Sequence, residues 1–353
     1  MQEILIPETG QRIPYTLEDG VVTLKPKQPD LELFQSAASL TLDLRASQGE
    51  AVVLSEIFRT GGDLQVLLPA GGFTLRSTWL KALPSGEAVL RLDKNDAGYG
   101  LSLTVDGSPL EQLPQPLTLS IQPPEGQRQQ MAWLMGENGE RTALLSAAQD
   151  GFLRVRTNWC GIIAIQADSW SSPFADVAET DWFAESVAYV SRMGLFAGIS
   201  DQAFGPHQTM TRGMLMTVLW RMEGKPAASE ACFADVPEDA WYAQAVSWAA
   251  SVGLAEGDGA GAFRPDAPVS REELLTFLWR YAKLGGAGMR GSAGALAELS
   301  DGSAVSSYAA EAVGCMAKYG VIQGSGGCLY PRETADRAEV AAILERLLQK
   351  VLL

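Results

Sequence analysis

The second half of the chain repeats itself three times, and this repetition limits what it can fold into. The tetrapeptide Phe174-Ala175-Asp176-Val177 returns as Phe233-Ala234-Asp235-Val236, and a diverged copy follows as Leu299-Ser300-Asp301-Gly302. Each copy is followed by an aromatic residue, a glycine pair, a proline and an arginine. Repeats of this length cannot bury an apolar face alone and must stack on one another. This half is therefore predicted to be an assembly of three repeats.

Each repeat is predicted to form a helix, a loop and a second helix. The first helix opens at an aromatic residue, Trp182, Trp241 or Tyr308. It ends at a glycine, which adopts the left-handed conformation without steric cost, at Gly194, Gly253 or Gly320. The second helix opens after a residue whose side chain can cap a helix N-terminus, at Thr211, Ser270 or Asp336. Capping boxes are completed in the second and third repeats by Glu273 and Glu339.

An arginine stands at the first position of each second helix, as Arg212, Arg271 and Arg337. A positive charge there is mildly unfavourable against the helix dipole, so three arginines in register indicate a constraint other than helix stability. One explanation is an anion held near the helix N-terminus, where backbone N–H groups also point. The other is a buried ion pair with the repeated aspartate, and the two are compatible.

The aromatic residue that opens each first helix is a candidate sugar-binding residue. Tryptophan and tyrosine rings can stack on the apolar face of a pyranose while their polar edge stays hydrated. Packing between helices is an equally strong explanation for the same three residues. Trp220 and Trp279, further along the second helices, are expected in the core.

Residues 172–353 resemble the S-layer homology family in the triplicated Phe-x-Asp-Val, the aromatic-led helix, the Gly-x-x-x-Gly loop and the Thr/Ser-Arg-x-Glu element. The resemblance implies an all-α pseudo-threefold prism around a central three-helix bundle. Grooves between repeats would hold secondary cell-wall polysaccharide, commonly carrying pyruvate ketals. The predicted polysaccharide-binding residues are Arg212, Arg271, Arg337, Trp182, Trp241, Tyr308, Asp176, Asp235, Asp301, Glu273 and Glu339.

The three repeats, predicted at 172–229, 230–290 and 298–353, depart from the family pattern to different degrees. The first has Met214 where the family has glutamate, and the third has Tyr308 in place of tryptophan. The second is closest to the pattern, so grooves that involve it are expected to be the stronger sites. A Gly/Ala-rich insert, residues 285–297, is predicted to be a flexible surface linker.

Residues 1–168 are predicted to be strands. Apolar residues alternate in short runs broken by turn residues, which is typical of strands with one buried face. Asn138-Gly139 and Asp150-Gly151 are suited to hairpin turns. No helix is expected here. The chain is thus predicted to be multidomain, an antiparallel β-sandwich-like region followed by the helical repeats, with a sub-boundary near 60–72.

No catalytic constellation, metal site or cofactor motif is recognised. No histidine precedes His207, which excludes a His-based triad or His-ligated metal from the strand-rich half. The four cysteines of the whole chain, Cys160, Cys232, Cys315 and Cys328, lack metal spacing and are expected to be free thiols. A carboxylate pair for glycoside hydrolysis leaves no sequence signature. A non-catalytic anchor is therefore expected, and a tethered carbohydrate-active enzyme is the alternative.

The net charge of −15 argues against a nucleic-acid partner. An anionic polymer could bind only where local arginines outweigh this field. The sequence has no apolar run of 18 residues, the length needed to span a bilayer. Its N-terminus lacks signal-peptide features. We interpret the chain as extracellular, located in the cell wall or a surface layer into which it could self-associate, with a signal peptide expected upstream. A cytoplasmic protein is the alternative interpretation.

Overall fold

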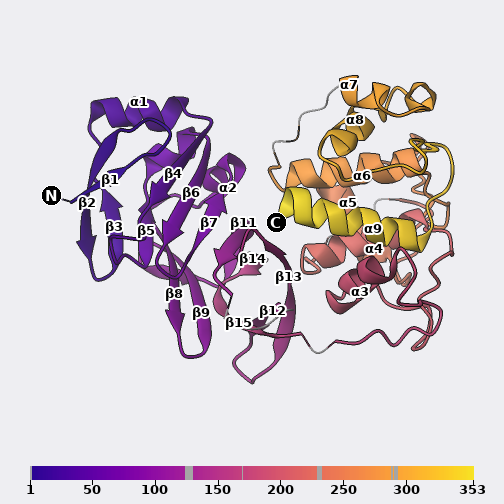
Figure 1. The fold of residues 1–353 in the computed structure, drawn as a ribbon, viewed down its shortest axis with the longest axis horizontal. Helices are drawn as coiled ribbons and strands as arrows, with labels where there is room; N and C mark the ends of the chain where they lie inside the picture. Colours follow the sequence, from indigo (N-terminus) through magenta and orange to yellow (C-terminus); the bar gives the residue numbers. More distant parts are fainter. Residues whose placement is uncertain (1, 124–129, 169, 229–232, 288, 290–292) are drawn as a thin grey trace. The chain divides into compact units, whose positions relative to one another are not determined.

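The computed structural model describes residues 2–123, 130–168, 170–228, 233–287, 289 and 293–353 (Figure 1). The chain divides into two compact parts, residues 1–169 and residues 170–352. We call them the β region and the helical region.

The described strands of the β region form a single hydrogen-bonded path. Their bounds are β1 Gln2–Leu5, β2 Arg12–Glu18, β3 Val21–Leu24, β4 Ser39–Asp43, β5 Ala51–Leu54, β6 Asp63–Leu68, β7 Gly71–Leu75, β8 Ala88–Asn95, β9 Gly98–Val105, β10 Ser108–Leu110, β11 Gln112–Ile121, β12 Gln130–Met135, β13 Arg141–Gln149, β14 Phe152–Trp159 and β15 Gly161–Ala167. The order is β1-β2-β3-β5-β8-β9-β15-β12-β13-β14-β11-β7-β6-β4, with β10 beside β9.

This sheet nearly closes on itself. Its two end strands, β1 and β4, contact each other, and the Thr41 hydroxyl of β4 donates to Glu8 Oε1 at 2.6 Å. Alternate residues along the strands, such as Leu42, Val66 and Leu90, point into one shared apolar core. The predicted strand character is confirmed, whereas the division into two sandwiched sheets is not.

Two strand pairs correct the expectation of a fully antiparallel region, because β3 pairs with β5 and β4 pairs with β6 in parallel. Parallel neighbours require a crossover connection. The helix α1 (Gln28–Ser36) lies in the β3-to-β5 connection, followed along the chain by η1 (Glu56–Thr60) and α2 (Ser77–Ala82). The expectation of no helix was therefore wrong.

The missed helix α1 carries a start signal. Pro29 lies in its first turn and the Asp30 carboxylate accepts the Lys27 backbone N–H at 2.7 Å. On its buried face, Phe34 packs edge-on against Phe58, with ring centroids 5.0 Å apart. This apolar face is too short to give a clear helical period.

Both predicted hairpins are confirmed. Asp150 and Gly151 have φ of 51° and 79° and form the two-residue turn between β13 and β14. Asn138-Gly139 lies in the longer loop between β12 and β13, which are antiparallel partners.

The helical region contains three pairs of helices, α3/α4, α5/α6 and α8/α9, one pair per repeat (Figure 1). The described elements are α3 Ala184–Arg192, α4 Arg212–Met222, α5 Ala243–Ser251, α6 Arg271–Leu284, α7 Ala293–Ala297, η2 Gly302–Ala304, α8 Ala310–Lys318, α9 Arg337–Leu347 and the π-helical turn η3 Leu348–Leu352. Each first helix begins two residues after its predicted aromatic. The terminating glycines have the predicted left-handed conformation, with φ of 67°, 71° and 68° at Gly194, Gly253 and Gly320.

A ring of backbone hydrogen bonds joins the three repeats. Met210 N–H donates to the Ala335 carbonyl at 2.9 Å, Ala335 N–H to Val269 at 3.0 Å, and Val269 N–H to Met210 at 2.9 Å. These residues occupy the same position in each repeat, directly before the second helix. The first helix of each repeat packs on the second helix of the preceding one, α5 on α4, α8 on α6 and α3 on α9. The contacts thus follow a cyclic order.

The insert at 285–297 is not a free linker in its described residues. Ala287 and Met289 are buried. The short helix α7 contacts α8, and Ala295 of α7 is also buried. Apolar side chains therefore tie this Gly/Ala-rich segment to the third repeat.

Two further features are the absence of a membrane-spanning helix among the described residues and the state of the cysteines. Among the described residues, no helix combines the length and apolarity needed to cross a bilayer. Cys160, Cys315 and Cys328 are free thiols, and Cys232 lies outside the described residues.

Candidate functional site

The second helices are capped as predicted. The backbone N–H at the third helical position donates to Thr211 Oγ1 at 3.3 Å, to Ser270 Oγ at 3.3 Å and to Asp336 Oδ1 at 2.8 Å. In return, the Glu273 and Glu339 carboxylates accept the backbone N–H of the capping residue, Ser270 at 2.9 Å and Asp336 at 3.2 Å. Both capping boxes are thereby confirmed.

The first N–H groups of these helices are occupied by the neighbouring repeat. Arg212 N–H donates to the Ala267 carbonyl at 3.0 Å and Gly213 N–H to Pro265 at 2.8 Å. The corresponding N–H groups of Arg271 and Arg337 are bonded in the same way. An anion bound nearby must therefore be recognised by side chains.

The repeated aspartates organise the loop within their own repeat. Asp176 accepts the N–H groups of Phe204 and Gly205, both at 2.8 Å. Asp235 and Asp301 accept equivalent pairs at 2.7–2.8 Å. Burial alone would raise the pKa of these carboxyls, but the backbone donors outweigh it and the pKa of each lies below its usual value.

The repeated arginines reach across to the next repeat in the ring. Arg212 Nε donates to the Phe263 carbonyl at 2.8 Å, and Arg337 Nε donates to the Phe204 carbonyl at 2.9 Å. Each guanidinium also lies over the ring of the same phenylalanine, 4.6 Å from the ring centroid. Arg271 instead pairs with Glu339 of the third repeat. Within the described residues no ion pair joins these arginines to the repeated aspartates. The explanation of the arginines as partners of a buried Arg–Asp ion pair was therefore wrong.

These arginines differ in how far they remain available to a ligand. Arg337 is 6% exposed, and burial lowers its pKa to about 10. Burial also lowers the pKa of Arg212. Much of the donor capacity of Arg212 and Arg337 is used to hold repeats together.

The three aromatic residues are exposed. Trp182, Trp241 and Tyr308 are 64%, 60% and 57% accessible. The residue that follows each one, Phe183, Tyr242 or Ala309, is buried instead. The packing explanation therefore applies to the neighbours. Trp220 and Trp279, expected in the core, are only partly buried.

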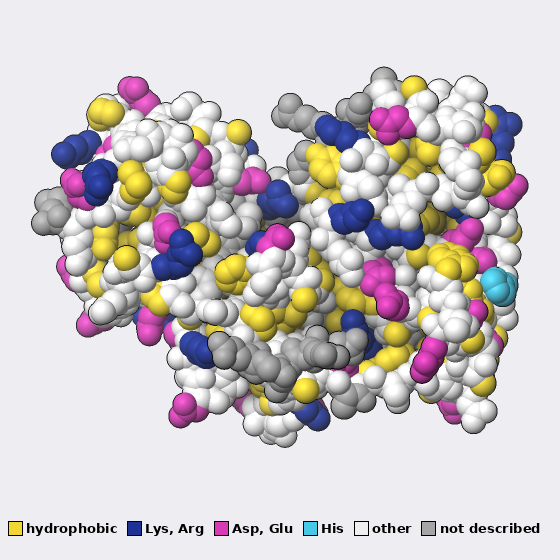
Figure 2. Space-filling view, viewed as in Figure 1, with side chains coloured by type: hydrophobic (Ala, Val, Ile, Leu, Met, Phe, Trp, Pro, Cys, Tyr) yellow, Lys and Arg dark blue, Asp and Glu magenta, His cyan; other side chains and the backbone are white. Residues whose placement is uncertain are grey.

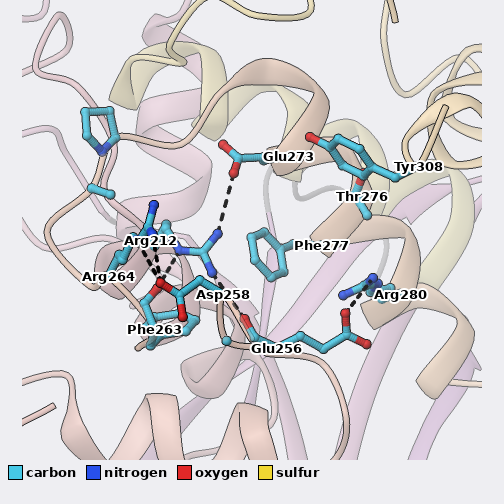
Figure 3. A pocket seen from close by; sticks show the side chains of 13 residues that line it. Arg212, Glu256, Asp258, Phe263, Arg264, Glu273, Thr276, Phe277, Arg280 and Tyr308 are labelled. Atoms are coloured by element: carbon cyan, nitrogen blue, oxygen red, sulfur yellow. Dashed lines mark hydrogen bonds and ion pairs between the residues drawn. The ribbon is translucent and has the colours of Figure 1, made fainter. Parts of the chain in front are cut away.

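One hollow of about 340 Å³, the Arg212 groove, combines residues of all three repeats (Figure 3). Arg212 comes from the first repeat, Phe277 and Arg280 from α6 of the second, and Tyr308 from the third. Arg212 Nη1 lies 3.6 Å from Glu273 Oε1, and Arg280 Nη2 lies 3.2 Å from Glu256 Oε2. Arg264 forms a third pair with Asp258 at 2.8 Å.

A second hollow of about 470 Å³, the Arg271 groove, is the counterpart one step along the ring. It is lined by Arg271 of the second repeat, Glu339 and Arg346 of α9, and Trp182 of the first repeat. The equivalent residues at the third interface of the ring are Arg337, Arg221 and Trp241, and Met214 stands there in place of the glutamate. Arg221 donates to the Leu195 carbonyl at 2.9 Å.

The sequence reasoning missed the arginine on the outer turn of each second helix. Arg221, Arg280 and Arg346 stand nine positions after the first arginine in all three repeats, and Arg280 and Arg346 line the two hollows. Their regular spacing was a usable signal. Basic and acidic side chains are mixed over the visible face of the helical region (Figure 2). No described group of His, Cys, Asp and Glu is arranged to hold a metal ion.

A buried carboxylate fixes Tyr308. Glu272 of α6 is 5% exposed and accepts the Ser306 N–H at 2.9 Å, the Ser306 hydroxyl at 2.7 Å and the Tyr308 hydroxyl at 3.1 Å. Burial and this nearby negative charge raise the pKa of Tyr308 above its ordinary value. The sister repeats have Gly213 and Ala338 here, so the contact belongs to the Arg212 groove.

Comparison with known proteins matches this part of the chain to a family. The S-layer homology domain model matches residues 173–213, 233–275 and 298–341. The three matches fall on the three repeats, in tandem. Such domains indicate a protein of the cell surface.

The similar proteins are much longer. The chain is 29% identical over 186 residues to the amylopullulanase of Thermoanaerobacterium thermosulfurigenes, which covers 52% of this chain and 10% of that protein. It is 28% identical over 171 residues to the surface-layer 125 kDa protein of Lysinibacillus sphaericus (47% and 14%). It is 33% identical over 116 residues to a cell surface protein of Thermoanaerobacter kivui (31% and 15%).

Proposed function

Because the C-terminal half of the chain consists of three tandem S-layer homology domains, we propose that they anchor the protein by binding secondary cell-wall polysaccharide that carries pyruvate ketals. The observation that best supports this is the construction of the two grooves. Each combines arginines from two repeats with an exposed aromatic ring from the third. The all-α pseudo-threefold prism is part of this proposal, and the cyclic order of contacts supports it.

The groove side chains suit an acidic sugar. A guanidinium can bind a carboxylate through two parallel N–H···O bonds. An exposed tryptophan or tyrosine offers a flat apolar surface to a pyranose ring. The grooves lie in an acidic protein, so the local arginines supply the attraction against a net charge of −15.

Retention on purified Gram-positive cell wall tests this proposal. We expect the chain to bind intact wall and to lose binding after acid removes the secondary polymer. Trp182→Ala should weaken retention. Trp159→Ala is the matched control, because Trp159 is also exposed (39%) but lies in the β region. Equal binding to intact and stripped wall would refute the proposal.

We also propose that the protein is non-catalytic and that the β region is displayed on the wall or acts as a spacer. The relatives that are enzymes match over the S-layer homology part, so their names assign no catalytic role to the β region. Incubation of the chain with soluble and wall glycans should release no sugar. Glycan hydrolysis that persists after purification to homogeneity would favour the tethered enzyme.

Self-association into a surface layer is a further part of the proposal, supported by relatives named surface-layer proteins. Electron microscopy of the chain incubated with purified wall should then show ordered arrays, and a uniform coat without order would count against them.

A further inference from the structure

We propose that the two grooves take differently charged parts of the wall polymer: the Arg271 groove binds an acidic sugar and the Arg212 groove binds an uncharged one. This assignment rests on the proposed function. It is carried by how the cations in each groove are already paired.

Every arginine of the Arg212 groove has its own carboxylate. Arg212 faces Glu273, Arg264 is bound to Asp258, and Arg280 is bound to Glu256 (Figure 3). The charges of the groove therefore cancel. An incoming carboxylate would have to displace an existing partner and would lie beside it afterwards, at a cost in electrostatic repulsion.

The Arg271 groove keeps a free cation. Arg271 is paired with Glu339. Arg346, on the outer turn of α9, lines the same hollow, and no carboxylate among the described residues lies within ion-pair distance of it. One positive charge therefore remains uncompensated in this groove.

The sister positions explain this difference. Gln323 and Ser325 of the Arg271 groove stand where the Arg212 groove has Glu256 and Asp258. Two uncharged side chains thus replace two carboxylates. Trp182 lines the same hollow as Arg346, so the groove offers both a stacking surface and an available guanidinium.

The Arg212 groove is suited instead to hydroxyl groups. Its carboxylates accept hydrogen bonds, and Thr276 and Tyr308 add hydroxyls at its wall. Sugar hydroxyls can donate to these groups and accept from the arginines without breaking the ion pairs. The exposed Tyr308 ring supplies the apolar contact.

Arg346→Gln and Arg280→Gln form a matched pair, because both remove one guanidinium at the same position of a second helix. Isothermal titration of the full chain with a methyl glycoside carrying a 4,6-pyruvate ketal, and with the same glycoside lacking the ketal, measures both affinities. A charge-assisted hydrogen bond contributes about 1.5–3 kcal/mol, so Arg346→Gln should weaken ketal binding about tenfold or more. Arg280→Gln should change it less than about twofold.

A gain of binding provides a second, independent test. Glu256 is exposed, and Glu256→Gln frees Arg280 while keeping the backbone carbonyl near Arg212. We expect this variant to bind one more ketal molecule per chain. Unchanged stoichiometry would overturn the assignment.

The remaining outcomes separate the two proposals. Equal losses of ketal binding in the two arginine variants, or a greater loss in Arg280→Gln, would overturn the charge assignment while the anchor function stands. Failure of the wild-type chain to bind purified wall polymer would overturn both. Circular dichroism melts verify that each variant is folded.

Discussion

Replacing Arg337 by alanine removes a cation that joins the third repeat to the first. Its Nε donates to the Phe204 carbonyl at 2.9 Å and its Nη2 to the Ala197 carbonyl at 2.7 Å. The guanidinium also lies 4.6 Å from the Phe204 ring centroid. Because Arg337 is 6% exposed, water cannot readily replace these contacts.

The expected loss of stability follows from these contacts. Two hydrogen bonds from a charged donor contribute about 1.5–3 kcal/mol each, and a desolvated cation–π contact about 1–2 kcal/mol. Burying the guanidinium opposes part of this gain, so we expect Arg337→Ala to lower the free energy of unfolding of the helical region by about 3–5 kcal/mol.

Urea denaturation followed by circular dichroism at 222 nm measures this change, since the helices dominate that signal. Arg346→Ala is the control, because Arg346 makes no such contact with the described residues. Its replacement should lower the free energy of unfolding by less than about 0.5 kcal/mol. A loss below about 1 kcal/mol for Arg337→Ala, or equal losses for both variants, would refute the assignment of Arg337 as a tie between repeats.

The contacts of Glu272, Asp235 and Arg271 give three other predictions. Glu272→Ala should lower the unfolding free energy by about 2–3 kcal/mol because three donors lose their acceptor; a thermal melt that matches wild type would contradict this. The pKa of Asp235 and of its two counterparts is lowered in the folded protein. Their ionised carboxylates therefore stabilise the fold fully above about pH 4, and this stabilisation is lost as the pH falls through the lowered pKa values. Melts between pH 2.5 and 6 should therefore show acid destabilisation, weaker in Asp235→Asn, and identical pH slopes would contradict this. Arg271→Ala should weaken wall binding about tenfold, more than Trp279→Ala, when both variants are folded; a greater loss for Trp279→Ala would be contrary to the groove model.

Local signals predicted the helical repeats well. A helix start depends on side chains within one turn, so Ser270 and Glu273 could be recognised as a capping box from their spacing alone. Gly253 marked a helix end for the same reason. The Asp150-Gly151 turn was predictable because two adjacent residues fix its backbone.

Contacts between distant residues were not predictable in this way. The partners of Arg212 lie in the second repeat, more than forty residues away, and follow from the cyclic packing of the repeats. The parallel pairing of β3 with β5 likewise depends on how the chain crosses over the sheet. Burial of Met289 within a Gly/Ala-rich segment also depends on its neighbours in space.

The charge difference between the grooves was only partly predictable from the sequence. Glu256 and Gln323 occupy equivalent loop positions in the sequence. Their importance appears only when Arg280 and Arg346 are placed beside them. The repeated arginine that the sequence emphasised therefore has a large structural role, and the outer arginine distinguishes the grooves.

We propose that wall polysaccharide binds in the grooves of the helical region. The indole N–H signals of the ¹⁵N-labelled protein, titrated with purified secondary polymer, test it most directly. We predict that the Trp182 signal shifts on binding whereas the Trp159 signal, from an exposed indole of the β region, does not. A shift of the Trp159 signal without a shift of the Trp182 signal would contradict binding in the grooves.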